Sequence, residues 1–299
     1  MKVIDSVARM ATLARILRKE GKTIALVPTM GYLHEGHLTL AKTAKKHTDV
    51  VVMSIFVNPA QFGPNEDFEK YPRDPKRDEE LARTAGVDVL FYPSVKEMYP
   101  GGYSTYVNVE GLSDVLCGAS RPGHFRGVAT VVAKLFGIVK PDITYFGQKD
   151  AQQLIIIRKM AQDLNMGIEI KSIPTVREAG GLAMSSRNSY LSEDQKEEAL
   201  ALFRSLEKAE SLIRQGEKDS KKIIAAIKNM IKDKPSIKID YVSIVDTKTL
   251  KDADTISGEV LIAVAALSGE TRLIDNIIVN LPAQNLPKDE IKKRKEVKA

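Results

Sequence analysis

The feature of the sequence that most constrains the fold is an apolar run at residues 49–58, DVVVMSIFVN. A continuous run rich in β-branched residues is typical of a strand inside a parallel sheet, where helices cover both faces. A second such run, TIALVP, lies at residues 23–28, and the intervening residues 38–47 have the apolar spacing of a helix. The pattern therefore indicates a strand–helix–strand unit, a common opening of an α/β sheet.

The same alternation continues through the first half of the chain. Helical spacing occurs at residues 7–17, 75–85, 127–139 and 151–164, and strand-like runs occur at residues 87–92, 143–146 and 168–174. Strands that alternate with helices predict a Rossmann-like, doubly wound parallel sheet. Such a sheet binds its ligands at the carboxyl ends of its strands.

A change in composition at residues 175–192, TVREAGGLAMSSRNSYLS, indicates a domain boundary. Two unequal domains suit a chain of 299 residues, because single cores stop growing at about 250 to 300 residues. Beyond the boundary we expect helices at residues 192–216 and 220–233 and strands at 238–245, 259–267 and 271–279. The predicted parts are a Rossmann-like domain at 1–175, a hinge and loop at 176–190, a smaller C-terminal α+β lid domain at 191–281 and a charged tail at 282–299.

The sharpest local motif is PTMGYLHEGH, residues 28–37, which lies where a predicted strand meets a helix. Gly31 and Gly36 let the backbone approach a ligand, and the helix that follows offers unpaired N–H groups to a phosphate. His34 and His37 can donate to phosphate oxygens whose charge grows in a transition state. The alternatives are a structural role at a tight turn and a zinc pair. A zinc site needs further ligands, for which the chain has two more histidines and one cysteine.

The string His34-Glu35-Gly36-His37 resembles the HxGH signature of the nucleotidylyltransferase superfamily, to which class I aminoacyl-tRNA synthetases belong. Four further segments occur in the order and at the spacing of the pantothenate synthetase family. They read SIFVNPAQFG at residues 54–63, RPGHFRGV at 121–128, YFGQKDAQQ at 145–153 and MSSRN at 184–188. The chain resembles that family over residues 1–280 and departs from it in the charged segment beyond.

The resemblance implies that ATP and pantoate give pantoyl adenylate and pyrophosphate, and that the amine of β-alanine then displaces AMP to give pantothenate. A carboxylate is a poor electrophile until its oxygen becomes part of a good leaving group, which adenylation achieves. No protein nucleophile is needed, so the enzyme would position its substrates and stabilise charge on the α-phosphate. By the same resemblance the protein is a homodimer, and residues 1–175 bind the nucleotide and pantoate.

The resemblance also assigns the residues of the site. Catalysis would fall to His34, His37, Lys149 and Arg187. Contacts with ATP would come from Met30, Gly31, Tyr32, Leu33, His34, Glu35, Gly36, His37, Gly147, Gln148, Lys149, Asp150, Val176, Met184, Ser185, Ser186 and Arg187. Pantoate would be bound by Met30, Asn58, Gln61 and Gln153.

Several of these residues also have a chemical interpretation of their own. Asn58 and Gln61 follow a predicted strand, where a ligand would lie, and their amides both donate and accept hydrogen bonds. The alternative is that they only form the turn around Pro59. Lys149 and Asp150 begin a helix and could hold phosphate and ribose, although such pairs are also common on protein surfaces.

The segment MSSR at residues 184–187 resembles the KMSKS loop of class I synthetases. Arg187 offers a charged fork for phosphate, and the serines add hydroxyl donors. Gly180 and Gly181 would form a hinge that closes this loop over ATP, and the alternative is an ordinary flexible linker. His124 lies in a segment at the rim of the family's active site, but a satisfied structural histidine is a comparable interpretation.

We expect Mg²⁺ to arrive with the triphosphate and assign no protein ligand to it. Asp74, Asp78 and Glu79 are better explained as an acidic helix start than as Mg²⁺ ligands. Cys117 is the single cysteine, and it is expected to be a small buried residue and not a nucleophile. One cysteine cannot form an intrachain disulfide, which suits a reducing compartment.

Composition limits the remaining functions. The formal net charge is +6, but much of the excess lies in the lysines and arginine of the tail, so the charge alone does not argue for nucleic acid. Aromatic residues make up only 6% of the chain and Trp is absent, so stacking surfaces for single-stranded nucleic acid are poorly supplied. The alternatives left open are another HxGH adenylyl- or cytidylyltransferase and an RNA-binding protein that uses the basic tail.

The sequence also indicates a compartment. It has no run of about 20 apolar residues long enough to span a bilayer, and its start lacks the apolar core of a signal peptide. We therefore expect a soluble cytoplasmic protein with no membrane or nucleic-acid partner.

Overall fold

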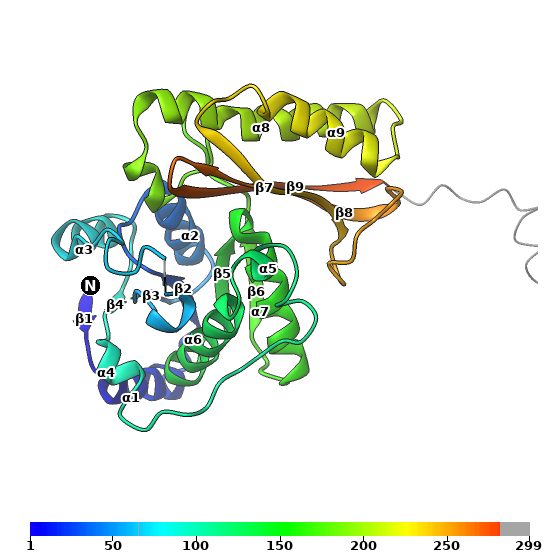
Figure 1. Cartoon of the computed structure of the whole chain (residues 1–299). Helices are drawn as coiled ribbons and strands as arrows, with labels where there is room; N and C mark the ends of the chain where they lie inside the picture. The colour runs from blue at the N-terminus through cyan, green and yellow to red at the C-terminus, as the bar shows by residue number, and fades with distance from the viewer. Residues whose placement is uncertain (65, 282–299) are drawn as a thin grey trace, which may run out of the picture.

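The computed structural model describes residues 1–64 and 66–281, which form a larger α/β domain and a smaller α+β domain (Figure 1). The larger domain is built on six parallel strands in the order β1-β4-β3-β2-β5-β6. They are β1 Lys2–Ile4, β2 Ile24–Thr29, β3 Val50–Ile55, β4 Val89–Phe91, β5 Ile143–Gly147 and β6 Glu169–Ile173. The direction of the strand order reverses between β2 and β5, and open α/β sheets bind ligands at such a switch point.

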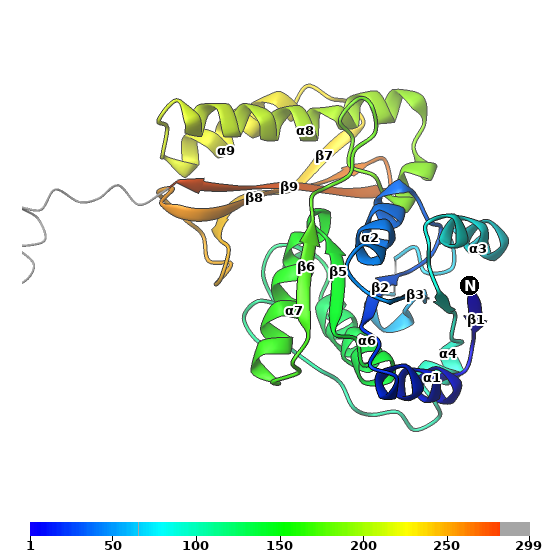
Figure 2. The ribbon, with the colours of Figure 1, turned by 180° about the vertical axis from the view of Figure 1, so that it is seen from behind.

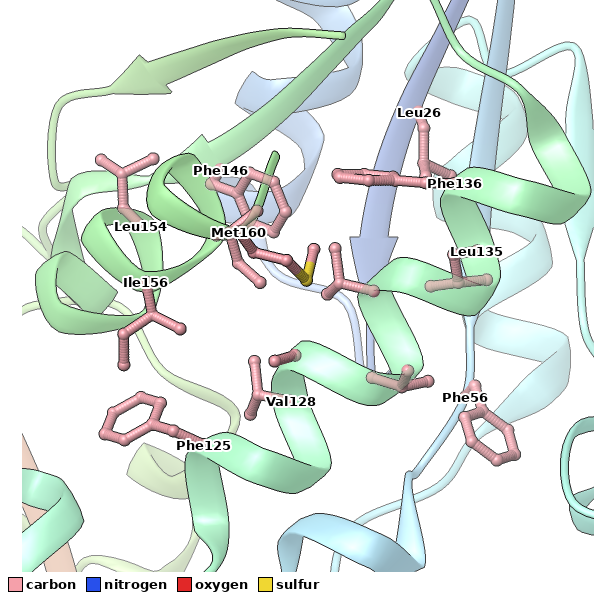
Figure 3. Close-up of a cluster of buried hydrophobic side chains, with 14 of the residues drawn as sticks. Leu26, Phe56, Phe125, Val128, Leu135, Phe136, Phe146, Leu154, Ile156 and Met160 are labelled. Carbon is pink, nitrogen blue, oxygen red and sulfur yellow. The ribbon is translucent and has the colours of Figure 1, made fainter. Parts of the chain in front are cut away.

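Helices cover both faces of this sheet. They are α1 Val7–Lys19, α2 Glu35–Lys45, α3 Pro75–Thr84, α4 Val95–Met98, α5 Cys117–Ser120, α6 His124–Val139 and α7 Ala151–Asp163. Successive strand residues point to opposite faces, so Leu26 packs in the core that contains α1, α6 and α7, whereas Val27 packs with α2 and α3. Figure 3 shows the first of these cores, in which Phe136 of α6 lies close to Leu26. This covering explains why the central strands are apolar along their whole length.

The smaller domain is an antiparallel sheet covered by two helices. Its elements are α8 Glu193–Arg214, α9 Ser220–Ile231, β7 Ile237–Asp246, β8 Gly258–Ser268 and β9 Thr271–Leu281, with strand order β7-β8-β9. Both helices lie on the side of the sheet that faces away from the larger domain (Figures 1 and 2). Ile262 of β8 packs with these helices, whereas the neighbouring Leu261 and Ala263 join the core of the larger domain. The sheet therefore links the two domains.

These elements confirm the predicted fold class. Two predicted helices begin earlier than expected. The helix placed at 38–47 begins at Glu35 because His34 caps it, and the helix placed at 127–139 begins at His124 after Gly123, whose φ of 82° turns the chain into it. The sequence did not predict β1, because three residues with only one buried side chain carry no clear period.

The domain bounds 1–175, 176–190 and 191–281 remain predictions. The predicted charged tail at 282–299 lies outside the described residues. Within the part of the chain that the structure describes, no helix is long and apolar enough to cross a membrane.

Candidate active site

Three loops meet at the carboxyl ends of the central strands. β2 leads into a turn and α2, β3 leads into the short helical turn Pro59–Gln61, and β5 leads into a similar turn, Gln148–Asp150. These loops line a cavity of about 220 Å³. It adjoins a cavity of about 1040 Å³ between the two domains, and the two share Arg121, His124, Lys149, Asp150, Gln153, Ser185 and Arg187. The combined space suits a nucleotide with a second small substrate.

The turn before α2 is held by a buried carboxylate. Gly31 has φ of 84°, and a side chain there would lie 2.8 Å from Ile55 and 2.9 Å from Asp78, so only glycine fits. Asp78 of α3 is 2% exposed, and its carboxylate accepts from the backbone N–H groups of Tyr32 at 2.8 Å and Leu33 at 2.7 Å. Asp78 therefore fixes the backbone that presents the two histidines.

His34 and His37 form a neutral pair at the start of α2. Their ring centroids are 4.0 Å apart, and His34 Nδ1 accepts from the N–H of Gly36 at 3.2 Å. Burial and then the nearby Lys149 cation lower the pKa of His34 to about 4. Burial, His34 and Lys149 lower the pKa of His37 well below its usual value. Both rings are thus uncharged at neutral pH, and His34 carries its proton on Nε2.

The turn that carries Lys149 is fastened by the smaller domain. Asn276 of β9 donates to the backbone oxygens of Gln148 at 3.1 Å and Lys149 at 2.8 Å. The side chain of Gln148 returns a hydrogen bond to Asn276 Oδ1 at 3.0 Å. Lys149 Nζ itself lies 3.4 Å from Asp150 Oδ1 and lines both cavities. The small sheet thus positions a cation that belongs to the larger domain.

The loop at residues 184–190 lies against the turn before α2. Ser186 donates its hydroxyl to the backbone oxygen of Tyr32 at 3.2 Å, and Ser185 Oγ accepts from the N–H of Arg187 at 3.3 Å. The N–H of Met184 donates to the backbone oxygen of Val176 at 2.9 Å. Two segments far apart in the sequence therefore form adjoining walls of the smaller cavity, which we call the cleft.

Arg187 does not point freely into this cleft. Its guanidinium makes two hydrogen bonds to Asp67, at 2.9 Å from Nε and 2.8 Å from Nη2. Burial alone would lower the pKa of Arg187, but the bonds and charge of Asp67 outweigh it and raise the pKa. A similar pair joins Arg121 to the adjacent Glu66. Two arginines that line the cavity are therefore already neutralised by one short acidic segment.

The amide of Gln61 is fixed from behind by Asn58. Asn58 is 1% exposed and donates to Gln61 Oε1 at 3.0 Å, while Gln61 Nε2 lies 3.1 Å from Met30 Sδ. The backbone oxygen of Gln61 also accepts from His124 Nδ1 at 2.8 Å. Burial and then Arg121 lower the pKa of His124 to about 4, so this ring is neutral as well. His124 therefore lies at the rim of the cleft and is also a satisfied structural histidine.

The structure brings most of the expected site residues to the smaller cavity. It is lined by Met30, His34, Gly36, His37, Gln61, Gly147, Lys149, Asp150, Gln153, Val176, Met184, Ser185, Ser186 and Arg187. Six expected residues do not line it, namely Gly31, Tyr32, Leu33, Glu35, Asn58 and Gln148. Leu33 is fully buried, and Glu35 points outward to Lys42 at 2.7 Å. The direct contacts expected of these six residues with the substrates therefore stay predictions, and any contact of Gly31 would come from its backbone.

The hinge expected at Gly180 and Gly181 stays a prediction, and the structure shows how closely both positions pack. A side chain at Gly181, whose φ is 102°, would lie 2.3 Å from the ring of Phe203, and one at Gly180 would lie 3.2 Å from Leu200. Both glycines therefore allow the segment to pack tightly against α8. Nearby, Arg177 makes two hydrogen bonds to Asp275 of β9, at 2.6 and 3.0 Å, so the segment is anchored at this point.

The acidic side chains and the cysteine near this site have structural contacts of their own. Residues 1–64 and 66–281 contain no group of three or more His, Cys, Asp or Glu side chains placed to hold a metal ion. The acidic residues Asp74 and Asp78 instead cap α3 and hold the turn before α2. Cys117 is buried, with Sγ 3.1 Å from the hydroxyl of Tyr241.

Sequence patterns missed the residues that hold this site together. Asp67, Asp78 and Asn276 lie outside the motifs of the family resemblance and have common polar side chains. The acidic start of α3 was a visible signal, but the sequence did not show that it faces the turn before α2.

Comparison with known proteins gives consistent matches. The family model described as Pantoate-beta-alanine ligase matches residues 2–278. The chain is 57% identical over 281 residues to the pantothenate synthetase of Acetivibrio thermocellus, covering 94% of this chain and 100% of the relative. The corresponding protein of Moorella thermoacetica is also 57% identical over 281 residues, with 94% and 99% covered.

Solved structures agree with these matches. The pantothenate synthetase from Thermus thermophilus has a TM-score of 0.88 and 44% identity, covering 93% of this chain and 99% of that one. The pantoate-beta-alanine ligase from Francisella tularensis, solved with beta-gamma ATP and beta-alanine, has a TM-score of 0.75 and 34% identity, with 93% and 97% covered.

Proposed function

Because this chain belongs to the pantoate-beta-alanine ligase family, we propose that it joins pantoate to β-alanine through pantoyl adenylate in the cleft above β2 and β5. Pantothenate formation is the family's reaction, and ATP is its third substrate. Family membership decides against a nucleotidyltransferase of another kind. The observation that carries the proposed route is the neutral pair of His34 and His37, beside Lys149, at the start of α2.

The histidine pair suits a phosphate whose negative charge grows. The Nε2–H of His34 is free to donate because Nδ1 already accepts from Gly36. The N-terminus of α2 and the Lys149 cation add positive potential at the same place. These groups are fixed by Asp78 and Asn276 before ATP arrives, so they need little reorganisation during the reaction.

The wall formed by residues 184–190 has to change partners when ATP binds. The guanidinium of Arg187 can bind a phosphate through two N–H donors, but these donors are already hydrogen-bonded to Asp67. We infer that the triphosphate displaces Asp67 from Arg187, while Ser185 and Ser186 add hydroxyl donors. Exchange of one anion for another keeps the guanidinium paired in both states, which limits the desolvation cost.

Pantoate would be oriented by amides. Gln61 presents its Nε2 donors toward the cleft because Asn58 occupies its oxygen. Gln153 of α7 lines the same cavity and supplies a second amide. Hydroxyl and carboxylate oxygens of pantoate are suitable acceptors for these donors.

The proposed chemistry proceeds in two displacements. A carboxylate oxygen of pantoate attacks the α-phosphorus of ATP, the bond from phosphorus to the bridging oxygen breaks, and pyrophosphate leaves. The amine of β-alanine then attacks the acyl carbon, AMP leaves with the pantoate oxygen, and the nitrogen loses its proton. Protein groups act by positioning and by stabilising charge on the α-phosphate, which makes a protein nucleophile unnecessary.

We propose that Mg²⁺ enters with the triphosphate, whose charge it neutralises. Among the described residues, the smaller cavity is lined by one carboxylate, that of Asp150, which is half-exposed. A single carboxylate suits a cation that binds mainly to phosphates and keeps several waters.

We further propose a homodimer in the cytoplasm. The family resemblance supports the homodimer, and the single free thiol of Cys117 suits a reducing compartment. The division into a domain at 1–175, a phosphate-binding loop at 176–190 and a lid at 191–281 is proposed on the change of composition between them.

Exchange of radiolabelled pyrophosphate into ATP tests the adenylate route. If pantoate attacks ATP first, exchange requires pantoate and proceeds without β-alanine. Exchange that appears only when β-alanine is present, with net AMP formation intact, would contradict a free-standing adenylation step.

A further inference from the structure

A buried hydrogen-bond chain connects Gln61 to an aromatic residue outside the cleft. The hydroxyl of Tyr99 donates to Asn58 Oδ1 at 2.8 Å, and Asn58 Nδ2 donates to Gln61 Oε1 at 3.0 Å. Of these three residues, Gln61 lines the smaller cavity described above, and the other two lie behind it. Tyr99 follows α4 and packs against Phe56 and Tyr103, with ring centroids 6.1 and 5.0 Å away.

The partners of Asn58 decide which way its amide faces. Its oxygen accepts from Tyr99 and from the N–H of Ala60 at 3.2 Å, and its nitrogen donates to Gln61 and to the backbone oxygen of Gly127 at 3.0 Å. All four hydrogen-bonding positions of the amide are therefore filled. A flipped amide would face the N–H of Ala60 with a donor and the oxygen of Gly127 with an acceptor, which is unfavourable for buried groups.

We propose that Tyr99 is a positioning residue for pantoate, which acts through Asn58 to keep the donor side of Gln61 turned toward the substrate. This inference rests on the proposed role of Gln61. In the observed arrangement, one N–H of Gln61 donates to Met30 Sδ, and the other is left to recognise an oxygen acceptor on pantoate. Were the amide of Gln61 reversed, it would present its oxygen beside Met30 and repel the same acceptor.

Two further features support this role of Tyr99. Burial and the neighbouring Tyr103 raise the pKa of Tyr99, so its hydroxyl keeps the proton that it donates. At the other end of the hydrogen-bond chain, a side chain at Gly127 would lie 2.2 Å from the backbone oxygen of Ala60, so only glycine lets α6 approach the turn at this distance. The turn at Ala60 and the start of α6 at Gly127, which both bind Asn58, are therefore packed directly against each other.

The test compares Tyr99→Phe with Tyr103→Phe. Each change removes one phenolic oxygen from the same aromatic cluster, but the Tyr103 hydroxyl has no hydrogen-bond partner among residues 1–64 and 66–281. We expect Tyr99→Phe to raise the KM for pantoate about three- to tenfold, the usual effect of losing one buried hydrogen bond. The KM for ATP should match that of Tyr103→Phe, and both variants should stay folded at the assay temperature. An unchanged pantoate KM, or an equal rise for ATP, would overturn the proposal.

A double-mutant cycle with Gln61→Ala distinguishes positioning from a general structural effect. The quantity measured is kcat/KM for pantoate, from single-turnover consumption of pantoate. If Tyr99 acts through Gln61, Tyr99→Phe should have less than about a twofold effect in the Gln61→Ala background. A full effect in that background would contradict the proposal.

The same variants separate this inference from the proposed function. If Gln61→Ala leaves kcat/KM for pantoate unchanged, the assignment of Gln61 to pantoate is wrong and the inference falls with it. If Gln61→Ala lowers kcat/KM but Tyr99→Phe does not, the assignment stands and only the role of Tyr99 is overturned.

Discussion

The two walls of the cleft differ in the groups that they offer to a phosphate. On the wall formed by α2 and the turn after β5, His34 and His37 are neutral donors held by backbone and carboxylate contacts. On the wall formed by residues 184–190, Arg187 is fully charged but paired with Asp67. The first wall can therefore bind a phosphate as it stands, whereas the second can do so only after Arg187 separates from Asp67. We infer that the first wall is arranged for the phosphate before ATP binds, whereas the second reaches its catalytic arrangement only after the triphosphate displaces Asp67 from Arg187.

The largest expected effect comes from removing a cation. Lys149→Ala and Arg187→Ala should each slow formation of enzyme-bound pantoyl adenylate by about 100-fold or more, since each removes a donor aimed at the reacting phosphates. Single-turnover adenylate formation is the measurement. Lys159→Ala, which changes an exposed lysine of α7, is the matched control. Near-normal rates in both variants would remove these residues from the site.

A smaller effect separates the two half-reactions. His37→Gln should slow adenylate formation by about 10- to 100-fold, because its hydrogen bond strengthens as charge builds on the transferring phosphate. Supplying pre-formed pantoyl adenylate should largely restore pantothenate formation from β-alanine. His47→Gln changes an exposed histidine just beyond α2 and should have no effect. Equal impairment of both half-reactions would contradict the role given to the first wall.

The second wall can be tested by freeing its arginine. Asp67→Asn should lower the KM for ATP about two- to fivefold, because binding no longer has to break an ion pair. Glu69→Gln removes the same charge from the same segment, and it is the control because Glu69 is exposed and its carboxylate has no partner within residues 1–64 and 66–281. An ATP KM that stays constant or rises in Asp67→Asn would show that the pair does not compete with the nucleotide.

The smallest expected effect is that of pH on the first wall. The pKa of His34 lies near 4, so the ring stays neutral from pH 8 down to about 5 and becomes protonated only as the pH falls further. Protonation would remove the acceptor that holds the N–H of Gly36. Adenylation measured in single turnovers should therefore show no histidine step between pH 5 and 8. A step near the usual histidine pKa of about 6.5 that disappears in His34→Gln would contradict the neutral pair.

The fold could largely be predicted from the sequence because its central strands carry a strong pattern. The apolar run at residues 49–58 became β3 in the interior of the sheet, and TIALVP became β2 beside it. β1 escaped prediction because it is short and lies at the edge of the sheet.

The site could be predicted only in part, for a related reason. His34, Lys149 and Arg187 belong to local motifs, so the sequence carries a signal for each. Their partners are remote: Asp78 is 45 residues from Leu33, and Asp67 is 120 residues from Arg187. Such contacts depend on how the elements pack in three dimensions, and no local pattern records them.

The transfer of oxygen from pantoate to AMP tests the central claim most directly. If pantoate attacks the α-phosphate and β-alanine then attacks the acyl carbon, the bridging oxygen must leave with AMP. Pantoate labelled with heavy oxygen in its carboxylate should therefore yield AMP that carries one labelled atom, as read by mass spectrometry. Unlabelled AMP, or ADP formed in step with pantothenate, would contradict the adenylate route and the roles given to His34 and His37.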